Sequence, residues 1–151
     1  MISFYKKLIP LTAAAMLTAC SSIAEYQSGL PYLEYHEVSA DISNRTAPSV
    51  NVNFCLVNHL NEDVDVSKLI LILFVNDLEI DLKEINYDKS ISENSEKCYK
   101  TVFEPDVIHN PAASSTLLNT MLDRTYKIEG TVVYDEKEAV PVTTKGEGIL
   151  R

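Results

Sequence analysis

An unbroken apolar run that ends in two turn-forming residues constrains the fold of this 151-residue chain more than any other feature. Residues 69–75 read LILILFV, and Asn76-Asp77 follow them directly. Asparagine and aspartate tolerate the left-handed backbone that a tight turn requires. The run therefore predicts a central strand that is covered on both faces. Residues 78–83 then alternate apolar and charged side chains, which indicates that the two segments form a β-hairpin.

The apolar periodicity elsewhere in the chain is also mostly that of strands. Polar segments at 58–65 and 90–96 are expected to connect neighbouring strands. The turns are spaced as in a sandwich, so we expect a mainly β fold: an immunoglobulin-like antiparallel β-sandwich of about seven strands. Apart from the hairpin, strands are predicted at 32–42, 50–56, 97–103, 126–134 and 140–144, with a last short strand that ends at Leu150.

One short helix is expected after the strand at 97–103. Asn110-Pro111 is typical of a helix start, with asparagine as the N-cap and proline at the first helical position. Four apolar side chains would then share one helical face; they are Leu117, Leu118, Met121 and Leu122.

The N-terminus is similar to the leader of a bacterial lipoprotein precursor. Lys6 and Lys7 precede the apolar residues 8–17, a stretch too short to span a bilayer comfortably. The run Leu17-Thr18-Ala19-Cys20 resembles a lipobox, which implies cleavage before Cys20 and lipidation, including palmitate, of that cysteine. The alternatives are an ordinary secretory signal with an incidental cysteine, or a cytoplasmic N-terminal helix.

This resemblance divides the chain into three parts. Residues 1–19 would be the signal peptide, residues 20–30 the acylated cysteine with a flexible tether, and residues 31–151 the β-sandwich domain. Residues 21–30 are mostly small and polar, and a flexible segment of ten such residues has an average end-to-end reach of about 17 Å. Ser21 stands where lipoproteins retained in the inner membrane usually carry aspartate, so the expected location is the outer membrane, lipid-anchored and facing the periplasm. Exposure on the cell surface stays open as an alternative.

Charge excludes one class of partner. The net charge is −9 for the whole chain, and removal of a leader with two lysines and no acid takes it to −11. Nucleic-acid binding needs clustered lysine and arginine, so no nucleic-acid partner is expected. Adhesion to anionic lipid is disfavoured for the same reason, which leaves the acyl group as the means of membrane attachment.

Two cysteines remain if Cys20 is acylated. Cys55 and Cys98 form an even pair in a compartment that would be oxidising, and a disulfide between them is the favoured interpretation. Closure of that loop would stabilise the fold by about 4 kcal/mol in the chain-entropy model. Two unrelated buried thiols are the alternative.

The order of elements resembles the late-embryogenesis-abundant (LEA) type 2 family, also called the WHy domain. The matching segment is NVNFCLVNHLNEDVDVSKLILILFVNDLEI, with Asn58 and Asn76 at the family's asparagine positions. Tyr126 and Gly130 match its later signature, although Asp77 replaces the glycine usual after Asn76. The resemblance covers residues 31–151. It implies a role in desiccation or envelope stress and supplies no catalytic residues.

No motif in the chain is typical of catalysis or of a cofactor. The three histidines, His36, His59 and His109, lie outside any recognisable metal-ligand spacing. Glu62, Asp63 and Asp65 lack the glycine and the bidentate glutamate of an EF-hand, and Ser114-Ser115 are expected to cap a helix. Neither a metal nor a cofactor is therefore expected, and the chain is not predicted to be an enzyme.

Tyrosines gather near the predicted anchor. Tyr26, Tyr32 and Tyr35 could form an interface, but packing of Tyr32 and Tyr35 on the edge of the sandwich is favoured.

These observations favour an outer-membrane lipoprotein with a non-catalytic role, either binding an envelope partner or protecting the envelope under stress. The alternative is a pilotin-like lipoprotein that binds a secretion-system subunit or a subunit of another envelope complex. A periplasmic hydrolase would need an acid or nucleophile cluster, and the sequence presents none. The sequence identifies no small-molecule ligand.

Overall fold

A computed structural model describes residues 29–106, 108–137 and 139–151. The predicted signal peptide, Cys20 and most of the tether lie outside the described residues. The order of elements is β1 (Tyr32–Asp41), β2 (Ser49–Asn58), β3 (Val64–Val75), β4 (Leu78–Ile91), β5 (Ser95–Phe103), α3 (Pro111–Leu118), β6 (Thr125–Tyr134) and β7 (Val142–Ile149).

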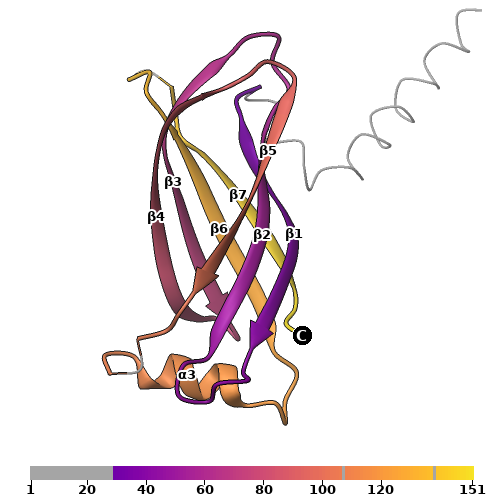
Figure 1. The fold of residues 1–151 in the computed structure, drawn as a ribbon, viewed down its shortest axis with the longest axis vertical. Helices are drawn as coiled ribbons and strands as arrows, with labels where there is room; N and C mark the ends of the chain where they lie inside the picture. The colour runs from indigo at the N-terminus through magenta and orange to yellow at the C-terminus, as the bar shows by residue number, and fades with distance from the viewer. Residues whose placement is uncertain (1–28, 107, 138) are drawn as a thin grey trace, which may run out of the picture.

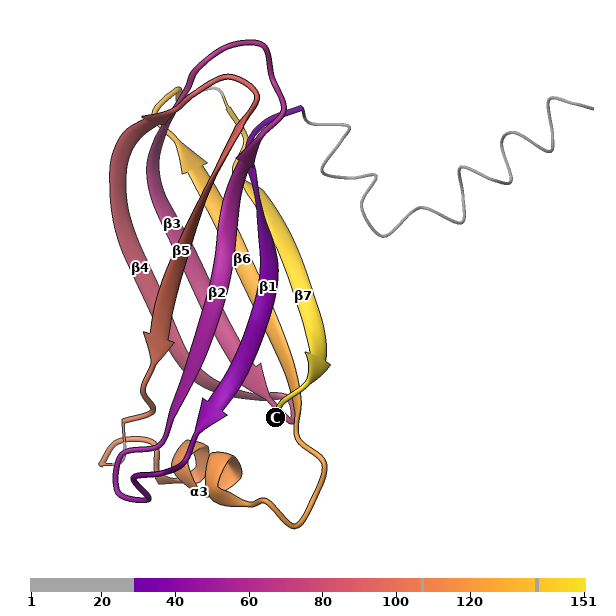
Figure 2. The same cartoon turned by 45° about the vertical axis from the view of Figure 1, so that its right-hand side comes forward.

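The strands form two antiparallel sheets packed face to face, which confirms the predicted sandwich (Figure 1). One sheet has the order β1-β2-β5 and the other has the order β4-β3-β6-β7. The chain passes from one sheet to the other three times: between β2 and β3, between β4 and β5, and between β5 and β6 through α3. Figure 2 shows α3 lying across the lower end of the sandwich, and the first strand begins at the opposite end.

The core lies between the sheets, where alternate side chains of each strand meet. Val50, Val52, Phe54 and Leu56 of β2 face Leu69, Leu71, Leu73 and Val75 of β3, all at most 1 % exposed. Leu117 of α3 closes the lower end of this core and is completely buried. Apolar burial of this kind is the main term that stabilises a domain.

The hairpin between β3 and β4 forms as predicted. Asn76 and Asp77 connect the strands with φ angles of 48° and 64°. Both angles lie in the left-handed region, which is the requirement of a type I′ turn.

The predicted bounds of two polar connections are wrong. The polar segments at 58–65 and 90–96 are shorter than expected, because β3 begins at Val64, β4 runs to Ile91 and β5 begins at Ser95. Backbone pairing continues through polar residues here, as in Asp65 with Ser90. The segments predicted at 140–144 and before Leu150 form the single strand β7, which pairs with β6 along its whole length.

The predicted helical face is wrong at its C-terminal half. The helix ends at Leu118, and Met121 and Leu122 are 92 % and 67 % exposed instead of continuing that face. The chain must turn back at this point, because the backbone of Asn76 pairs with that of Thr125 at the start of β6. Arg124 supports the turn, since its Nη1 donates a hydrogen bond to the carbonyl of Leu117 over 2.6 Å.

The central strand β3 is covered on one face instead of two. Ile70, Ile72 and Phe74 point away from the core and are half-buried. Among the described residues, no element packs over this outer face of the four-stranded sheet (Figures 1 and 2). The unbroken apolar run therefore reports one buried face and one face that neighbouring side chains cover only in part.

Candidate functional site

Asn58, the first residue that matches the family resemblance, is a buried structural amide. Its side chain is 0 % exposed at the end of β2. Nδ2 donates hydrogen bonds to the carbonyls of Glu62, Ile91 and Ser92 at 2.9, 3.2 and 3.1 Å. Oδ1 accepts from the backbone N–H of Leu60 at 3.0 Å. The amide thereby joins the β2–β3 connection to the end of β4, and both its nitrogen and its oxygen are hydrogen-bonded.

Asn76 also serves the fold. Its Oδ1 accepts the backbone N–H of Thr125 at 2.9 Å, so the hairpin turn is fixed to the start of β6. The left-handed backbone is an ordinary property of asparagine in turns, whereas this side-chain hydrogen bond reaches a residue 49 positions along the chain.

Gly130 and Tyr126 belong to two contacts between tyrosine and glycine. A Cβ built on Gly130 would overlap Tyr35 Oη and lie 2.7 Å from Cδ1 of Leu33. Tyr35 comes from the other sheet, and its hydroxyl donates to the carbonyl of Thr144 at 3.3 Å. Tyr126 packs in the same manner across Gly148, where a Cβ would lie 2.9 Å from its Oη. The absence of side chains at these glycines makes room for the tyrosine rings.

Sulfur atoms of Cys55 and Cys98 are joined in the structure by a disulfide of 2.01 Å. The two residues are directly opposite each other on β2 and β5. Cys55 is buried and Cys98 is exposed, so the bond lies on the outer face of the three-stranded sheet. Glu96 also approaches the two sulfurs, with the three possible ligand atoms within 4.8 Å of one another. The sulfurs are bonded to each other and cannot act as thiolate ligands in this state.

Ionisable side chains do not gather at one point in the described part of the chain. His36 lies 3.9 Å from Glu34, and His59 lies 3.0 Å from the hydroxyl of Tyr32. His109 is 2.5 Å from Asp106 at the lower end of the domain. Hydrogen bonds from the backbone and then the side chain of His109 lower the pKa of Asp106.

Several carboxylates do line one hollow at the end where β1 begins. Its volume is about 410 Å³. Asp63 accepts a hydrogen bond from the backbone of Glu93, and Asp65 accepts one from the hydroxyl of Ser90. These two carboxylates therefore link neighbouring strands and turns through hydrogen bonds. Among the described residues, the acidic side chains of this hollow do not bring three oxygen atoms close enough together to hold a metal ion. The acidic residues that line the hollow are Glu62, Asp63, Asp65, Asp135 and Glu136.

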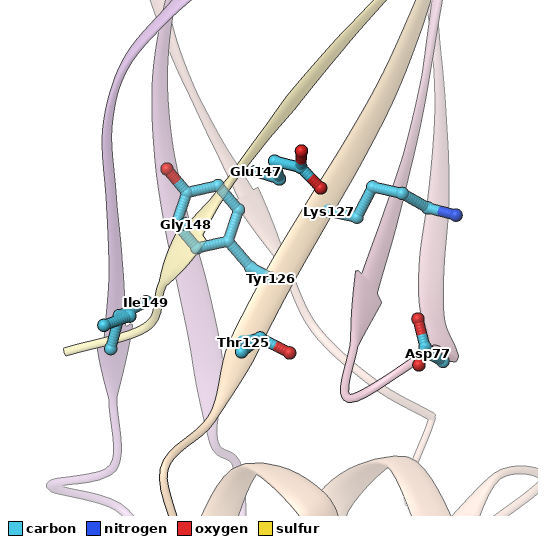
Figure 3. A pocket seen from close by; sticks show the side chains of 7 residues that line it. All are labelled: Asp77, Thr125, Tyr126, Lys127, Glu147, Gly148 and Ile149. Atoms are coloured by element: carbon cyan, nitrogen blue, oxygen red, sulfur yellow. The ribbon is translucent and has the colours of Figure 1, made fainter.

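A second hollow, of about 430 Å³, lies over the lower ends of β6 and β7. Figure 3 shows Tyr126 pointing away from Lys127 and Asp77 within it. Lys127 is engaged elsewhere, since its Nζ lies 4.6 Å from the ring centre of Phe74 and 3.5 Å from Glu129. The hollow has neither a nucleophile beside a base nor a convergent pair of carboxylates.

Tyrosines outside the sequence prediction link the two sheets. Tyr87 of β4 and Tyr99 of β5 bring their hydroxyl oxygens to 2.8 Å, and their rings meet edge to face. Burial and this hydrogen bond raise the pKa of Tyr87. Tyr134, whose hydroxyl donates to the carbonyl of Pro31, also has a raised pKa because it is buried. The sequence signal for these residues is only their alternation with apolar neighbours.

Two of the tyrosines near the predicted anchor pack on the domain. Tyr32 is 6 % exposed on β1, and Tyr35 lies against Gly130 and Gly146. Tyr26 lies outside the described residues. The structure therefore agrees with the packing interpretation for Tyr32 and Tyr35.

No known protein-family profile and no curated protein sequence matches the chain. Solved structures do match. The Arabidopsis thaliana protein At1g01470 is 16 % identical with a TM-score of 0.56, and the match covers 78 % of this chain and 80 % of that one. At2g46140.1, a protein described as late embryogenesis abundant (LEA), is 15 % identical with a TM-score of 0.54, and the match covers 96 % of this chain and 86 % of that one. The domain has an LEA-type fold. At this identity the likeness extends to the fold alone.

Within the described part of the chain, no helix combines the length and the apolar character needed to cross a bilayer.

Proposed function

We propose that the chain is an extracytoplasmic lipoprotein of a bacterial envelope, attached to the outer membrane through acyl chains on Cys20 and facing the periplasm. The Cys55–Cys98 disulfide is the observation that carries the proposal. Cys98 is exposed to solvent, and an accessible disulfide persists in an oxidising compartment but is rare in a reducing cytosol. The lipobox-like residues 17–20 supply the matching export and anchoring signal.

The proposed role is non-catalytic: binding an envelope partner or protecting the envelope under stress. The LEA-type fold supports this role, because one of the two structural relatives is itself described as a late embryogenesis abundant protein. The geometry of the described residues supports it as well. The hollow beside Tyr126 and the acidic hollow both lack the convergent groups that chemistry would require.

Attachment at the N-terminus would orient the domain. The β1 end carries Glu62, Asp63 and Glu136, whose charges repel anionic headgroups and would hold the domain away from the membrane. The α3 end would then point away from the lipid. Three exposed apolar side chains lie there and suit contact with a partner: Ile108, Met121 and Leu122, at 85 %, 92 % and 67 % exposed.

The anchor is tested by fractionating envelopes from cells fed a labelled fatty acid. The native chain is expected to carry label and to sediment with the outer membrane, whereas Cys20→Ala loses both properties. Ser21→Asp is the matched control, which keeps the label but moves to the inner membrane. Persistent membrane association of the Cys20→Ala variant would refute the anchor.

The role is tested by affinity capture of the acylated protein from crosslinked envelopes, with mass spectrometry as the readout. A Met121→Ser, Leu122→Ser variant is the comparison, because it removes exposed apolar area without touching the core. One dominant secretion-machine subunit, lost in the variant, would favour the pilotin-like alternative. Without a specific partner, the protective role predicts that a deletion strain survives drying and osmotic shock less well than its parent.

A further inference from the structure

The outer face of the four-stranded sheet presents an apolar stripe that the domain itself buries only in part. The stripe consists of Ile70, Ile72 and Phe74 on β3 with Leu82 beside them on β4. The first three are half-buried, and Leu82 is 46 % exposed. An antiparallel strand with one wet face normally alternates apolar and polar residues. Here three successive outward positions of the central strand are large and apolar instead, which is typical of an interaction surface.

Strand register places charged side chains on both sides of the stripe. Each row consists of residues paired directly across neighbouring strands, from β4 through β3 to β6 and, where β7 is paired, to β7. The rows are Glu79–Phe74–Lys127–Glu147, Leu82–Ile72–Glu129–Lys145, and Glu84–Ile70–Thr131–Thr143, followed by Asn86–Lys68–Val133.

These charges nearly cancel on the face. Three lysines and four glutamates leave a net charge of −1, whereas the whole chain carries −9. Several of these charged side chains form ion pairs within the face. Lys68 Nζ lies 2.9 Å from Glu84 Oε1, and Lys145 Nζ lies 3.8 Å from Glu129 Oε1. The opposite face of the sandwich differs. Its outward positions include Glu34, Glu37, Asp41 and Glu96 against the single lysine Lys100.

The nearly neutral charge of this face indicates which kind of partner can bind to it. Two copies of an acidic chain repel each other over most of their surfaces, and a nearly neutral apolar face is where they can approach. A basic partner would be drawn to the acidic surfaces instead. We infer that the stripe is the contact between two copies of this chain, which associate face to face through the β4-β3-β6-β7 sheet.

Two-fold symmetry makes the face complementary to itself. With the axis along β3, Ile70, Ile72 and Phe74 of one copy lie on the same residues of the other, and Leu82 lies over Glu129. The same rotation sets Glu79 over Lys127 and Glu84 over Thr131 of the second copy. Glu79 and Lys127 share one row of the sheet, so Glu79 of each copy meets Lys127 of the other copy.

Photo-crosslinking in cells that produce the full chain tests this contact. Two forms with different epitope tags are produced together, with a photoreactive phenylalanine analogue at Leu82. The same analogue at Ser39, on the outer face of the other sheet, is the matched control. We expect an adduct of twice the monomer mass that carries both tags from position 82, with at least about tenfold less from position 39.

Two further variants separate contact from folding. Ile72→Glu in the chain with the probe at position 82 is expected to lower the adduct about tenfold, because the contact would bury an unpaired charge. Formation of the Cys55–Cys98 disulfide, seen as a mobility difference without reductant, shows whether that chain still folds. Lys127→Glu is expected to lower the adduct, and Glu79→Lys in the same chain is expected to restore it.

The inference is overturned by three results: no doubly tagged adduct from position 82, equal adduct from positions 39 and 82, or an adduct with a different protein. Each of them is read independently of membrane fractionation. Failure of the lipid anchor and failure of the self-contact are therefore distinguishable.

Discussion

The hydroxyl group of Tyr35, from one sheet, fills the space that a side chain at Gly130 of the other sheet would need. The tyrosine hydroxyl lies where the Cβ of any other residue at position 130 would stand, and Cδ1 of Leu33 closes the same site from 2.7 Å. Gly146 receives the other edge of the ring, where an added Cβ would lie 2.6 Å from Cδ2. One aromatic side chain from β1 thus explains why β6 and β7 each carry a glycine at these inward positions.

Replacement of Gly130 by alanine is expected to destabilise the domain by about 1–3 kcal/mol, the usual cost of an overpacked core. Chemical denaturation monitored by circular dichroism measures this free energy of unfolding. Tyr35→Phe in the same chain removes the hydroxyl that collides and should recover part of the loss, while the Leu33 contact keeps the rest. Equal stability of Gly130→Ala and the native chain would contradict the close packing.

Truncation of Asn58 to alanine is expected to cost about 2–4 kcal/mol, because buried backbone groups on two connections would lose their partners. The free energy of unfolding in urea provides the measurement. Asn51→Ala on the same strand is the matched control, since that half-buried side chain faces outward, and its cost should be about 0.5 kcal/mol or less. Similar losses from both variants would show that the Asn58 amide has no special structural role.

Strand pairing could be predicted from this sequence more reliably than the environment of each face. The hairpin at Asn76-Asp77 follows from local turn chemistry. The sequence favours the disulfide because Cys55 and Cys98 remain as an even pair, but it does not show that their strands are neighbours. The apolar run at 69–75 does not show by itself whether one face or two are covered, because coverage depends on elements distant in the chain. The prediction that Met121 and Leu122 continue the helical face is wrong for a similar reason. Their spacing is helical, but the return to Thr125 ends the helix first.

Likewise, the tyrosine–glycine contacts depend on the register of strands that are far apart in the chain. Tyr35 and Thr144 are separated by 109 residues, and the sequence contains no local signal that joins them. Asn58 could be placed at a strand end from the family resemblance. Its bonds to Leu60 and Glu62 are local, whereas its bonds to the carbonyls of Ile91 and Ser92 form only when the end of β4 is folded beside it.

Removal of the disulfide by a Cys55→Ala, Cys98→Ala variant is expected to lower the free energy of unfolding. The sequence separation of 43 residues sets the loop that the bond closes. The chain-entropy model gives a loss of about 4 kcal/mol for a loop of this size. Guanidinium unfolding of the oxidised chain, the reduced chain and the variant measures it. A reductant should destabilise the native chain but leave the variant unchanged, and equal sensitivity of both would contradict the prediction.

Ser114→Ala is expected to stabilise the domain by about 0.5–1 kcal/mol, from better helix propensity and the removal of an unsatisfied hydroxyl. Ser114 is only 7 % exposed on α3, and its Oγ has no hydrogen-bond partner. Its predicted capping role is therefore wrong. Thermal unfolding provides the measurement, with Ser115→Ala on the exposed side of the helix as the control for propensity alone. A destabilised Ser114→Ala variant would show that the hydroxyl has a partner after all.

Asp106 should make stability fall at acidic pH. Its pKa is lowered from 3.8, first by the backbone N–H of His109 and then by the His109 side chain. A carboxyl group whose pKa is lower in the folded state contributes stability above its unfolded pKa and loses it as the pH falls through the folded value. The contribution is therefore present above about pH 4 and disappears below it. Carboxyl NMR titration of His109→Ala should show a pKa that rises only in part, because the backbone donor remains. If the pKa of Asp106 returned fully to 3.8 in this variant, the whole lowering would come from the imidazole and the backbone donor would have no effect.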